Sequence, residues 1–144
     1  MKRIHATSIA IKGRGVLLRG ASGSGKSDLA LRLMDDGADL VADDYTEVHA
    51  ERGELIATAP KTIQGLLEVR GVGILNVGHI THVPVVAVFD LVSLSEIERL
   101  PQPQTESIEG VDIAHYCLHG FDASAPAKVR IALMAQAENL FQAP

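Results

Sequence analysis

Short apolar segments separated by polar turns run along most of the chain and predict β-strands. Apolar residues alternate imperfectly over residues 4–11, which favours a strand with one buried face. Further strands are predicted at residues 16–18, 40–42, 55–59, 83–89 and 111–118, and the run 83–89 has the clearest character of a buried strand. Pro84 stands near the start of its run, where a missing backbone N–H does least harm to a sheet.

Two segments have the spacing of amphipathic helices. The first, residues 26–36, is followed by Gly37, which suits the position just after a last helical turn. Its apolar residues share one face and are Leu29, Ala30, Leu33 and Met34. The second helix is predicted to begin at about Pro126, because proline is favoured in a first turn. Its apolar stripe is predicted to contact the core or another subunit and consists of Val129, Leu133, Ala137, Leu140 and Phe141.

The mixture of strands and helices predicts a single α/β domain over residues 1–144, with a mixed β-sheet flanked by helices. A length of 144 residues and a mass of 15.3 kDa fit one domain. The polar stretch 101–107 carries two prolines and is too short to separate two domains, so it is predicted to be a surface loop.

The composition argues against several classes of protein. Lys and Arg number 13 and Asp and Glu number 18, for a net charge of −5, whereas general nucleic-acid binders normally carry a basic surplus. No apolar run reaches the roughly 20 residues that span a membrane, and the first residues lack the long apolar segment of a signal peptide. A single cysteine excludes an internal disulfide. We therefore expect a soluble cytoplasmic protein without a nucleic-acid or membrane partner.

Residues 20–27 match the P-loop pattern of nucleotide-binding proteins. Glycines let backbone N–H groups turn toward phosphate oxygens, and the following helix points its free N–H groups at the same anion. Lys26 is predicted to contact the β- and γ-phosphates, and the Ser27 hydroxyl is predicted to bind Mg²⁺. The predicted nucleotide-binding residues are Gly20, Ala21, Ser22, Gly23, Ser24, Gly25, Lys26 and Ser27.

Two adjacent carboxylates, Asp43 and Asp44, directly follow the short predicted strand 40–42. P-loop enzymes need a second carboxylate near the metal, usually at the end of a neighbouring strand. Adjacent residues at a strand end point differently, so one can approach the metal while the other accepts a proton from an attacking hydroxyl. The spacing leaves open which aspartate has which role.

Residues 66–76 read Leu-Leu-Glu-Val-Arg-Gly-Val-Gly-Ile-Leu-Asn. With the P-loop and the Val-Ala-Asp-Asp of residues 41–44, this segment resembles the catalytic domain of HPr kinase/phosphorylase. That family uses ATP and Mg²⁺ to phosphorylate a serine of HPr, a phosphocarrier of the sugar phosphotransferase system, and can remove the phosphate by phosphorolysis. The resemblance extends from about residue 4 to the final helix and is strongest over residues 4–76.

The resemblance implies the fold, the partner and the assembly of this protein. The fold would be similar to the P-loop core of phosphoenolpyruvate carboxykinase. The partner would be HPr or a nitrogen-type HPr-like phosphocarrier, whose phosphorylation would regulate the phosphotransferase system and carbon metabolism. A homo-oligomer is expected, since the family forms hexamers.

The resemblance also implies roles for individual residues. His5 matches the family's active-site histidine, although Ala6 stands where a glycine usually follows. Asp44, with Asp43 beside it, matches the base that deprotonates the target serine and returns the proton in the reverse reaction. Glu68 matches a second Mg²⁺ ligand.

Two arginines complete the implied active site. Arg70 lies in the segment important for both activities of the family, and Arg99 matches its active-site arginine. Residues 124–129 depart from the family's arginine-containing loop tied to phosphorolysis, and losing an arginine fork weakens bidentate phosphate recognition. The N-terminal domain of full-length members also has no counterpart here, so the chain resembles the short alphaproteobacterial form. We expect a protein-serine kinase, with phosphorolysis left open.

Two other functions are compatible with a P-loop. A small-molecule kinase of the nucleoside-monophosphate or shikimate type would need a substrate-binding insertion and an arginine-rich lid, and neither is evident in the sequence. A nucleotide-binding regulatory module without transfer activity is the other alternative, given the missing N-terminal domain and the altered loop. Phosphate transfer to a carrier protein distinguishes the kinase from both.

Histidines outside these motifs are predicted to have structural or solvent-exposed positions. His79 and His82 are predicted to be exposed loop residues, and residues 51–54 a solvated hairpin turn around a glycine. Three possible zinc ligands share one face of a predicted strand, but no fourth ligand is evident, so a zinc site is not expected there. These three are His115, Cys117 and His119.

Overall fold

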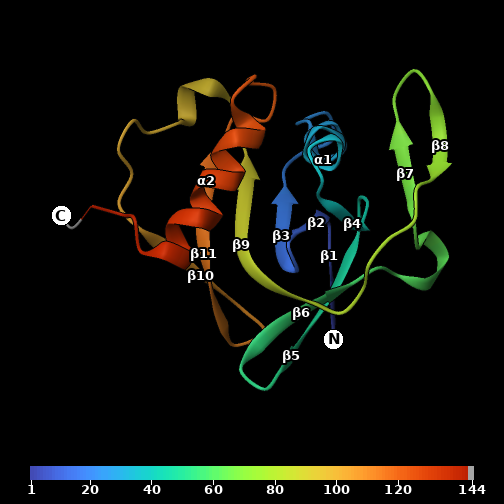
Figure 1. Ribbon diagram of the computed structural model, residues 1–144, viewed down its shortest axis with the longest axis horizontal. Helices are drawn as coiled ribbons and strands as arrows, with labels where there is room; N and C mark the ends of the chain where they lie inside the picture. Colours follow the sequence, from blue (N-terminus) through green and yellow to red (C-terminus); the bar gives the residue numbers. More distant parts are fainter. Residues whose placement is uncertain (143–144) are drawn as a thin grey trace.

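The computed structural model describes residues 1–142 and is organised by one curled sheet with a helix layer on one face (Figure 1). The main path of the sheet has the strand order β1-β5-β6-β9-β3-β2-β4, and β11 and β10 continue it from β9. The strands are β1 (Lys2–Ile4), β2 (Thr7–Ile11), β3 (Arg14–Arg19), β4 (Asp39–Ala42), β5 (Thr46–Glu51), β6 (Glu54–Thr58), β9 (Val83–Leu91), β10 (Gln104–Ile108) and β11 (Val111–Leu118).

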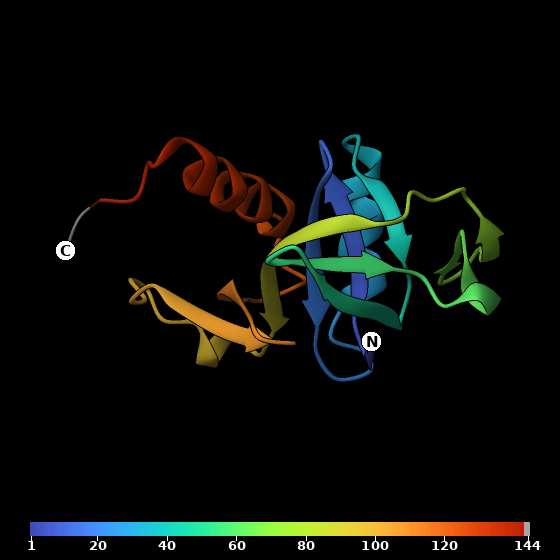
Figure 2. The ribbon, with the colours of Figure 1, turned by 90° about the horizontal axis from the view of Figure 1, so that it is seen from below.

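Two helices and a separate hairpin complete the fold. The helices are α1 (Lys26–Asp35) and α2 (Ala125–Glu138), with short 3-10 turns η1 (Lys61–Ile63) and η2 (Leu94–Glu96). The separate hairpin consists of β7 (Leu66–Val69) and β8 (Gly73–Asn76). In Figure 2 it projects from the opposite end of the molecule to α2.

β9 organises the sheet because it pairs with three strands. One edge of β9 runs parallel to β3, while the other pairs first with β6, antiparallel, and then with β11, parallel. β2 is antiparallel to both β3 and β4, so β4 points the same way as β3. The carboxyl ends of β3, β4 and β9 therefore meet at one edge, where ligands commonly bind in open α/β sheets.

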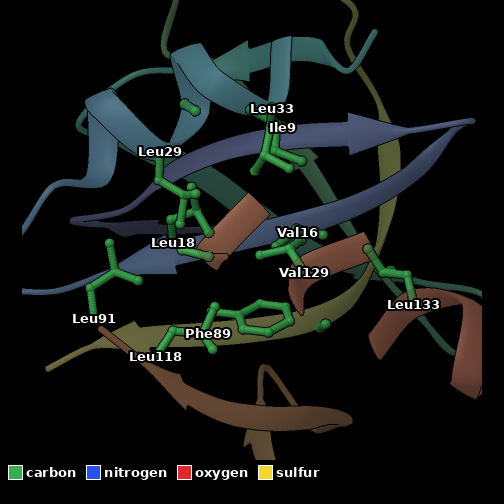
Figure 3. Close-up of a cluster of buried hydrophobic side chains, with 13 residues drawn as sticks. Ile9, Val16, Leu18, Leu29, Leu33, Phe89, Leu91, Leu118, Val129 and Leu133 are labelled. Atoms are coloured by element: carbon green, nitrogen blue, oxygen red, sulfur yellow. The ribbon is translucent and has the colours of Figure 1, made fainter. Parts of the chain in front are cut away.

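Alternating side chains of β3 contribute to two aliphatic cores. Val16 and Leu18 face the helices and join the cluster in Figure 3, which includes Phe89 from β9. Leu17 faces the opposite side and packs in a second cluster. Val129 of α2 is fully buried in the first cluster, so this helix is anchored to β9 and β3 by apolar contacts.

The predicted α/β class with a mixed sheet is confirmed, but the bounds of three segments are wrong, two of them in the sheet. The predicted strand 4–11 is interrupted at residues 5–6, because β1 pairs with β5 whereas β2 pairs with β3 and β4. The predicted loop 101–107 becomes β10 from Gln104 onward. Its polar residues suit an edge strand that pairs only with β11 among the described residues, and Glu109 and Gly110 close the hairpin with positive φ angles.

The last helix is shorter than predicted. It ends at Glu138, and Asn139 takes a left-handed backbone conformation that terminates it. Val129 and Leu133 pack in the core as predicted, but Leu140 and Phe141 follow the helix and are exposed. Neither helix in the described part of the chain has the length and apolar character needed to cross a bilayer.

Candidate active site

The P-loop joins the end of β3 to the start of α1. Gly20 and Gly25 have positive φ angles of 156° and 97°. A Cβ on Gly20 would lie 2.9 Å from the Leu91 carbonyl oxygen, and one on Gly25 would lie 3.1 Å from the Phe121 ring. The backbone therefore leaves no room for a Cβ at Gly20, and the left-handed conformation together with the close ring favours glycine at position 25.

Two polar groups of the P-loop lie beside this narrow cradle. The Lys26 side chain is only 7% exposed, and its Nζ donates to the carbonyl oxygens of Gly20 at 2.9 Å and Ala21 at 3.3 Å. The Ser24 hydroxyl is buried and has no hydrogen-bond partner among residues 1–142. A cradle too narrow for a Cβ, an unpaired buried hydroxyl and a lysine fit a phosphate group.

Asp43 is the point at which three elements of the site meet. Its Oδ1 accepts hydrogen bonds from the Ser27 hydroxyl at 2.6 Å and from the Thr7 hydroxyl at 3.0 Å. Its Oδ2 accepts the backbone N–H of Glu68 at 3.1 Å. Because Asp43 is buried, its carboxylate joins α1, β2 and β7 through hydrogen bonds that water does not replace.

Asp44 is exposed, unlike its buried neighbour Asp43. Its backbone has a φ of 67°, and its side chain is 57% exposed. His5 Nε2 lies 2.8 Å from Asp44 Oδ1, and the His5 ring stacks on Tyr45 with centroids 5.1 Å apart. The Asp44 N–H donates to the Thr7 hydroxyl at 3.0 Å, so Thr7 positions both aspartates.

A cleft of about 390 Å³ opens on one side of the P-loop. Both Lys26 and Ser27 line it, and so do Asp44, Glu68 and Arg70. These five predicted residues are thus brought together, with Glu68 and Arg70 supplied by β7 and the residue after it. Arg99 lies on the exposed segment between η2 and β10 and does not line this cleft.

A second cavity of about 370 Å³ lies on the other side of the P-loop. Leu91, Val92, His119 and Phe121 contribute to its wall, and Phe121 also borders the first cleft. Arg32 of α1 fixes this wall by donating to the Gly120 carbonyl oxygen, and to that of Asp122 at 3.0 Å. The first cleft is thus lined by side chains of both charges, whereas the second combines an aliphatic and aromatic wall with serines and Glu96.

Family comparison supports the class of protein that this geometry indicates. Residues 1–119 match the family model described as HPr Serine kinase C-terminal domain. The chain belongs to this family. The HPr kinase/phosphorylase of Limosilactobacillus reuteri is 40% identical over 122 residues, which cover 76% of this chain and 38% of that protein. The HPr kinase/phosphorylase of Exiguobacterium sibiricum is 51% identical over 75 residues, which cover 51% of this chain and 24% of that protein.

A solved structure of the same family has the same fold. The Hpr(Ser) kinase/phosphatase from Coxiella burnetii superposes with a TM-score of 0.86 at 25% identity, covering 97% of this chain and 99% of that chain. The family resemblance and the P-loop kinase fold expected from the sequence are therefore confirmed. The chain spans only 38% and 24% of the two sequence relatives above.

An ion-pair network that the sequence did not predict begins at Arg19, the residue directly before the P-loop. Arg19 donates to both carboxylate oxygens of Asp90, at 2.8 and 3.0 Å, and to both of Glu106, at 2.6 Å each. His115 Nε2 lies 2.7 Å from Asp90. The four residues come from four strands, β3, β9, β10 and β11, and no spacing within one segment could reveal them.

The network changes the pKa values of its members. Hydrogen bonds to Glu106 and Asp90 raise the pKa of Arg19 above its usual value. Burial by itself would raise the pKa of Asp90, but hydrogen bonds from Arg19 and His115 outweigh it and hold that pKa low. The hydrogen bonds from Arg19 also lower the pKa of Glu106. Arg19, Asp90 and Glu106 are therefore all charged at neutral pH. Their ion pairs stabilise the end of β3, which directly precedes the P-loop.

The three possible zinc ligands of the β11 region do not converge. His115 belongs to the ion-pair network, and His119 Nδ1 lies 3.0 Å from the Val92 carbonyl oxygen. Cys117 is exposed at its surface, and partial burial raises the pKa of its thiol.

Proposed function

We propose that this chain transfers the γ-phosphoryl group of ATP to a serine hydroxyl of HPr or of an HPr-like phosphocarrier. Family membership supports the class of reaction and the class of acceptor. The observation that supports specific catalytic roles is the difference between the contacts of the two adjacent aspartates. Asp43 is buried against Ser27 of the P-loop, whereas Asp44 is paired with His5 and faces the cleft.

The nucleotide would bind with its phosphates in the P-loop. Backbone N–H groups and Lys26 would hold the phosphate oxygens, and the Ser24 hydroxyl would gain a partner. The cavity beside Phe121 would hold the nucleobase, because its aromatic and aliphatic wall suits a flat ring and its polar residues could bond the ring's edge. Lys26 would exchange its contacts with loop carbonyls for contacts with phosphate.

A magnesium ion fits the oxygen donors on the opposite side of the loop. Ser27, Asp43 and Glu68 offer one hydroxyl and two carboxylates, the ligand types that Mg²⁺ prefers. Bound there, Mg²⁺ would neutralise negative charge on the β- and γ-phosphates. Thr7 would keep Asp43 in place for this role through its hydrogen bond.

Asp44 would act as the base on the acceptor side. The serine oxygen forms a bond to the γ-phosphorus while the bond from that phosphorus to the ADP oxygen breaks. The serine proton passes to the Asp44 carboxylate, and ADP leaves with the bonding electrons. His5 holds one carboxylate oxygen so that Asp44 stays oriented toward the cleft, and Arg70 would stabilise charge on the transferred group.

Mass spectrometry of the carrier protein tests this function. HPr-family carriers from the same organism are incubated with the chain, ATP and Mg²⁺. The proposal predicts one added phosphate on a serine, lost in Lys26→Ala and retained in Lys61→Ala, which removes an exposed lysine of η1. Nucleotide binding without phosphate on any carrier would contradict the proposal and favour a regulatory module.

A further inference from the structure

A cluster of two histidines and one glutamate lies away from the P-loop. His49 and Glu51 are alternate residues of β5 and project to the same face of the sheet. His82 immediately precedes β9, which pairs with β6 on the far side of the β5–β6 hairpin. The turn of this hairpin lies at the bottom of Figure 1, at the end of the molecule where β3 and β9 begin.

The cluster is separate from the proposed catalytic site. Thr46, at the start of β5, is two residues after Asp44 of the proposed catalytic site, whereas Glu51 is the last residue of the strand. Five steps of extended chain, about 17 Å, separate Thr46 from Glu51. A ligand held by Glu51 would therefore not touch Asp44 or the P-loop.

The three ligand atoms already have the spacing of a metal site. Glu51 Oε2 lies 3.0 Å from His49 Nε2 and 3.2 Å from His82 Nε2, and all three atoms lie within 4.8 Å of one another. Ligands of a tetrahedral zinc ion, with bonds of about 2.0–2.1 Å, lie about 3.3 Å apart. Two imidazoles therefore converge on one carboxylate oxygen at nearly the edge length that zinc requires.

Backbone conformation and exposure also favour a ligand. His82 has a φ of 59°, a conformation uncommon for residues other than glycine, and it holds the ring toward Glu51. The side chains of His49, Glu51 and His82 are 35%, 42% and 56% exposed. An ion could thus enter from solvent and keep water in the fourth position.

A second cluster of possible metal ligands differs because its carboxylates are already paired with an arginine. Asp90, Glu106 and His115 also lie close together, but the Arg19 guanidinium donates to all four carboxylate oxygens. That cluster already has its cation. Among residues 1–142, no lysine or arginine forms an ion pair with Glu51, whose recorded partners are the two histidines.

We propose that His49, Glu51 and His82 bind a divalent transition-metal ion of the zinc class. Imidazole nitrogen favours such ions, whereas Mg²⁺ prefers oxygen, so this site would not compete with the cleft for Mg²⁺. The ion would join the β5–β6 hairpin to the start of β9. Because it binds only the folded chain in this geometry, it would raise the midpoint of thermal unfolding.

Calorimetric titration of the full chain with Zn²⁺, in excess Mg²⁺ and a non-chelating buffer, tests the proposal. We expect one zinc ion per chain and an affinity at least about tenfold lower in His49→Gln and in His82→Gln. The matched variants His79→Gln and Glu54→Gln remove an exposed histidine outside the cluster and the glutamate opposite Glu51, and should bind zinc normally. Circular dichroism confirms that each variant is folded.

Three results would overturn the metal site. One is the absence of saturable zinc binding by the unaltered chain at micromolar zinc. Another is unchanged affinity in both His49→Gln and His82→Gln. The third is loss of zinc binding in Asp43→Asn with retention in His82→Gln, which would place the ion in the catalytic cleft. A zinc-dependent rise in the unfolding midpoint, abolished in His82→Gln, provides a second readout that needs no enzymatic activity.

Discussion

Replacing Thr7 with valine tests whether one buried hydroxyl positions both aspartates. Thr7 is fully buried, and its hydroxyl donates to Asp43 Oδ1 at 3.0 Å and accepts the Asp44 N–H at 3.0 Å. Valine has nearly the same shape but can neither donate nor accept. The variant Thr7→Val therefore removes one hydrogen bond from the buried Asp43 carboxylate. It also leaves the backbone N–H of Asp44 without its acceptor.

The cost can be worked out from these two hydrogen bonds. A hydrogen bond to a charged group contributes about 1.5–3 kcal/mol, and a buried donor left unpaired costs about 1–3 kcal/mol. Because the two effects share one hydroxyl and the site can relax, we expect a loss of about 2–4 kcal/mol in the free energy of unfolding. Domains commonly have about 5–15 kcal/mol, so the variant should fold. A shift of the aspartates by about 1 Å should lower kcat about tenfold to a hundredfold.

Thr46→Val is the matched control. Thr46 is also fully buried, and its hydroxyl bonds Ser8 at 2.8 Å and the Ala6 carbonyl oxygen at 2.9 Å without touching either aspartate. Urea unfolding and steady-state phosphorylation of the carrier are measured for both variants. We expect both to lose stability and only Thr7→Val to lose kcat by more than about threefold. Equal kcat values in the two variants would refute the positioning role of Thr7.

Three further perturbations follow from the same geometry. Phe121→Ala removes the ring between the two cavities and should raise the KM for ATP with little effect on kcat, and an unchanged KM would argue against the nucleobase site. Arg70→Lys keeps the charge but loses the guanidinium fork, so kcat for transfer should fall while nucleotide affinity, measured by calorimetry, is kept. Glu106 has a lowered pKa in the folded state, so its contribution to stability is present above its usual value of 4.5 and is lost as the pH falls below it. Acid unfolding of Glu106→Gln should therefore show a shallower loss of stability below that pH than the unaltered chain.

The sequence predicted local features well because each had a signal within one segment. The P-loop, the helix after it and the strand predicted at residues 83–89, which the structure extends to β9 (Val83–Leu91), all follow from periodicity or spacing. β10 could not be predicted in this way. Its residues are polar and follow two prolines, and only pairing with β11 makes them a strand.

The two adjacent aspartates show the same contrast between local signals and distant contacts. Their position after a short strand predicted a metal-binding and a proton-accepting carboxylate, but not which residue has which role. The structure separates them through contacts that are distant in sequence, with Ser27 and Thr7 on Asp43 and His5 on Asp44. Thr7 itself gave no distinguishing signal, because His5 and Ser8 of the same segment are polar as well.

Clusters assembled from several strands were beyond the reach of sequence reasoning. His82 was expected to be exposed, and its side chain is 56% exposed. It also contacts Glu51, which lies on β5, whereas His82 precedes β9. Arg19 ends β3 and directly precedes the P-loop, yet its two carboxylate partners lie 71 and 87 residues further along the chain. Such contacts depend on the strand order, which the local pattern does not specify.

The most direct test of the proposed mechanism compares transfer and nucleotide binding in Asp44→Asn. Rapid-quench mixing with ATP, Mg²⁺ and the carrier measures phosphoserine formation, while calorimetry measures nucleotide affinity. Asp39→Asn is the control, since it removes an exposed carboxylate at the other end of β4. The account predicts that Asp44→Asn binds MgATP normally but forms phosphoserine at least about a hundredfold more slowly, as expected for loss of a general base. Phosphoserine formation at the rate of the Asp39→Asn control would contradict it.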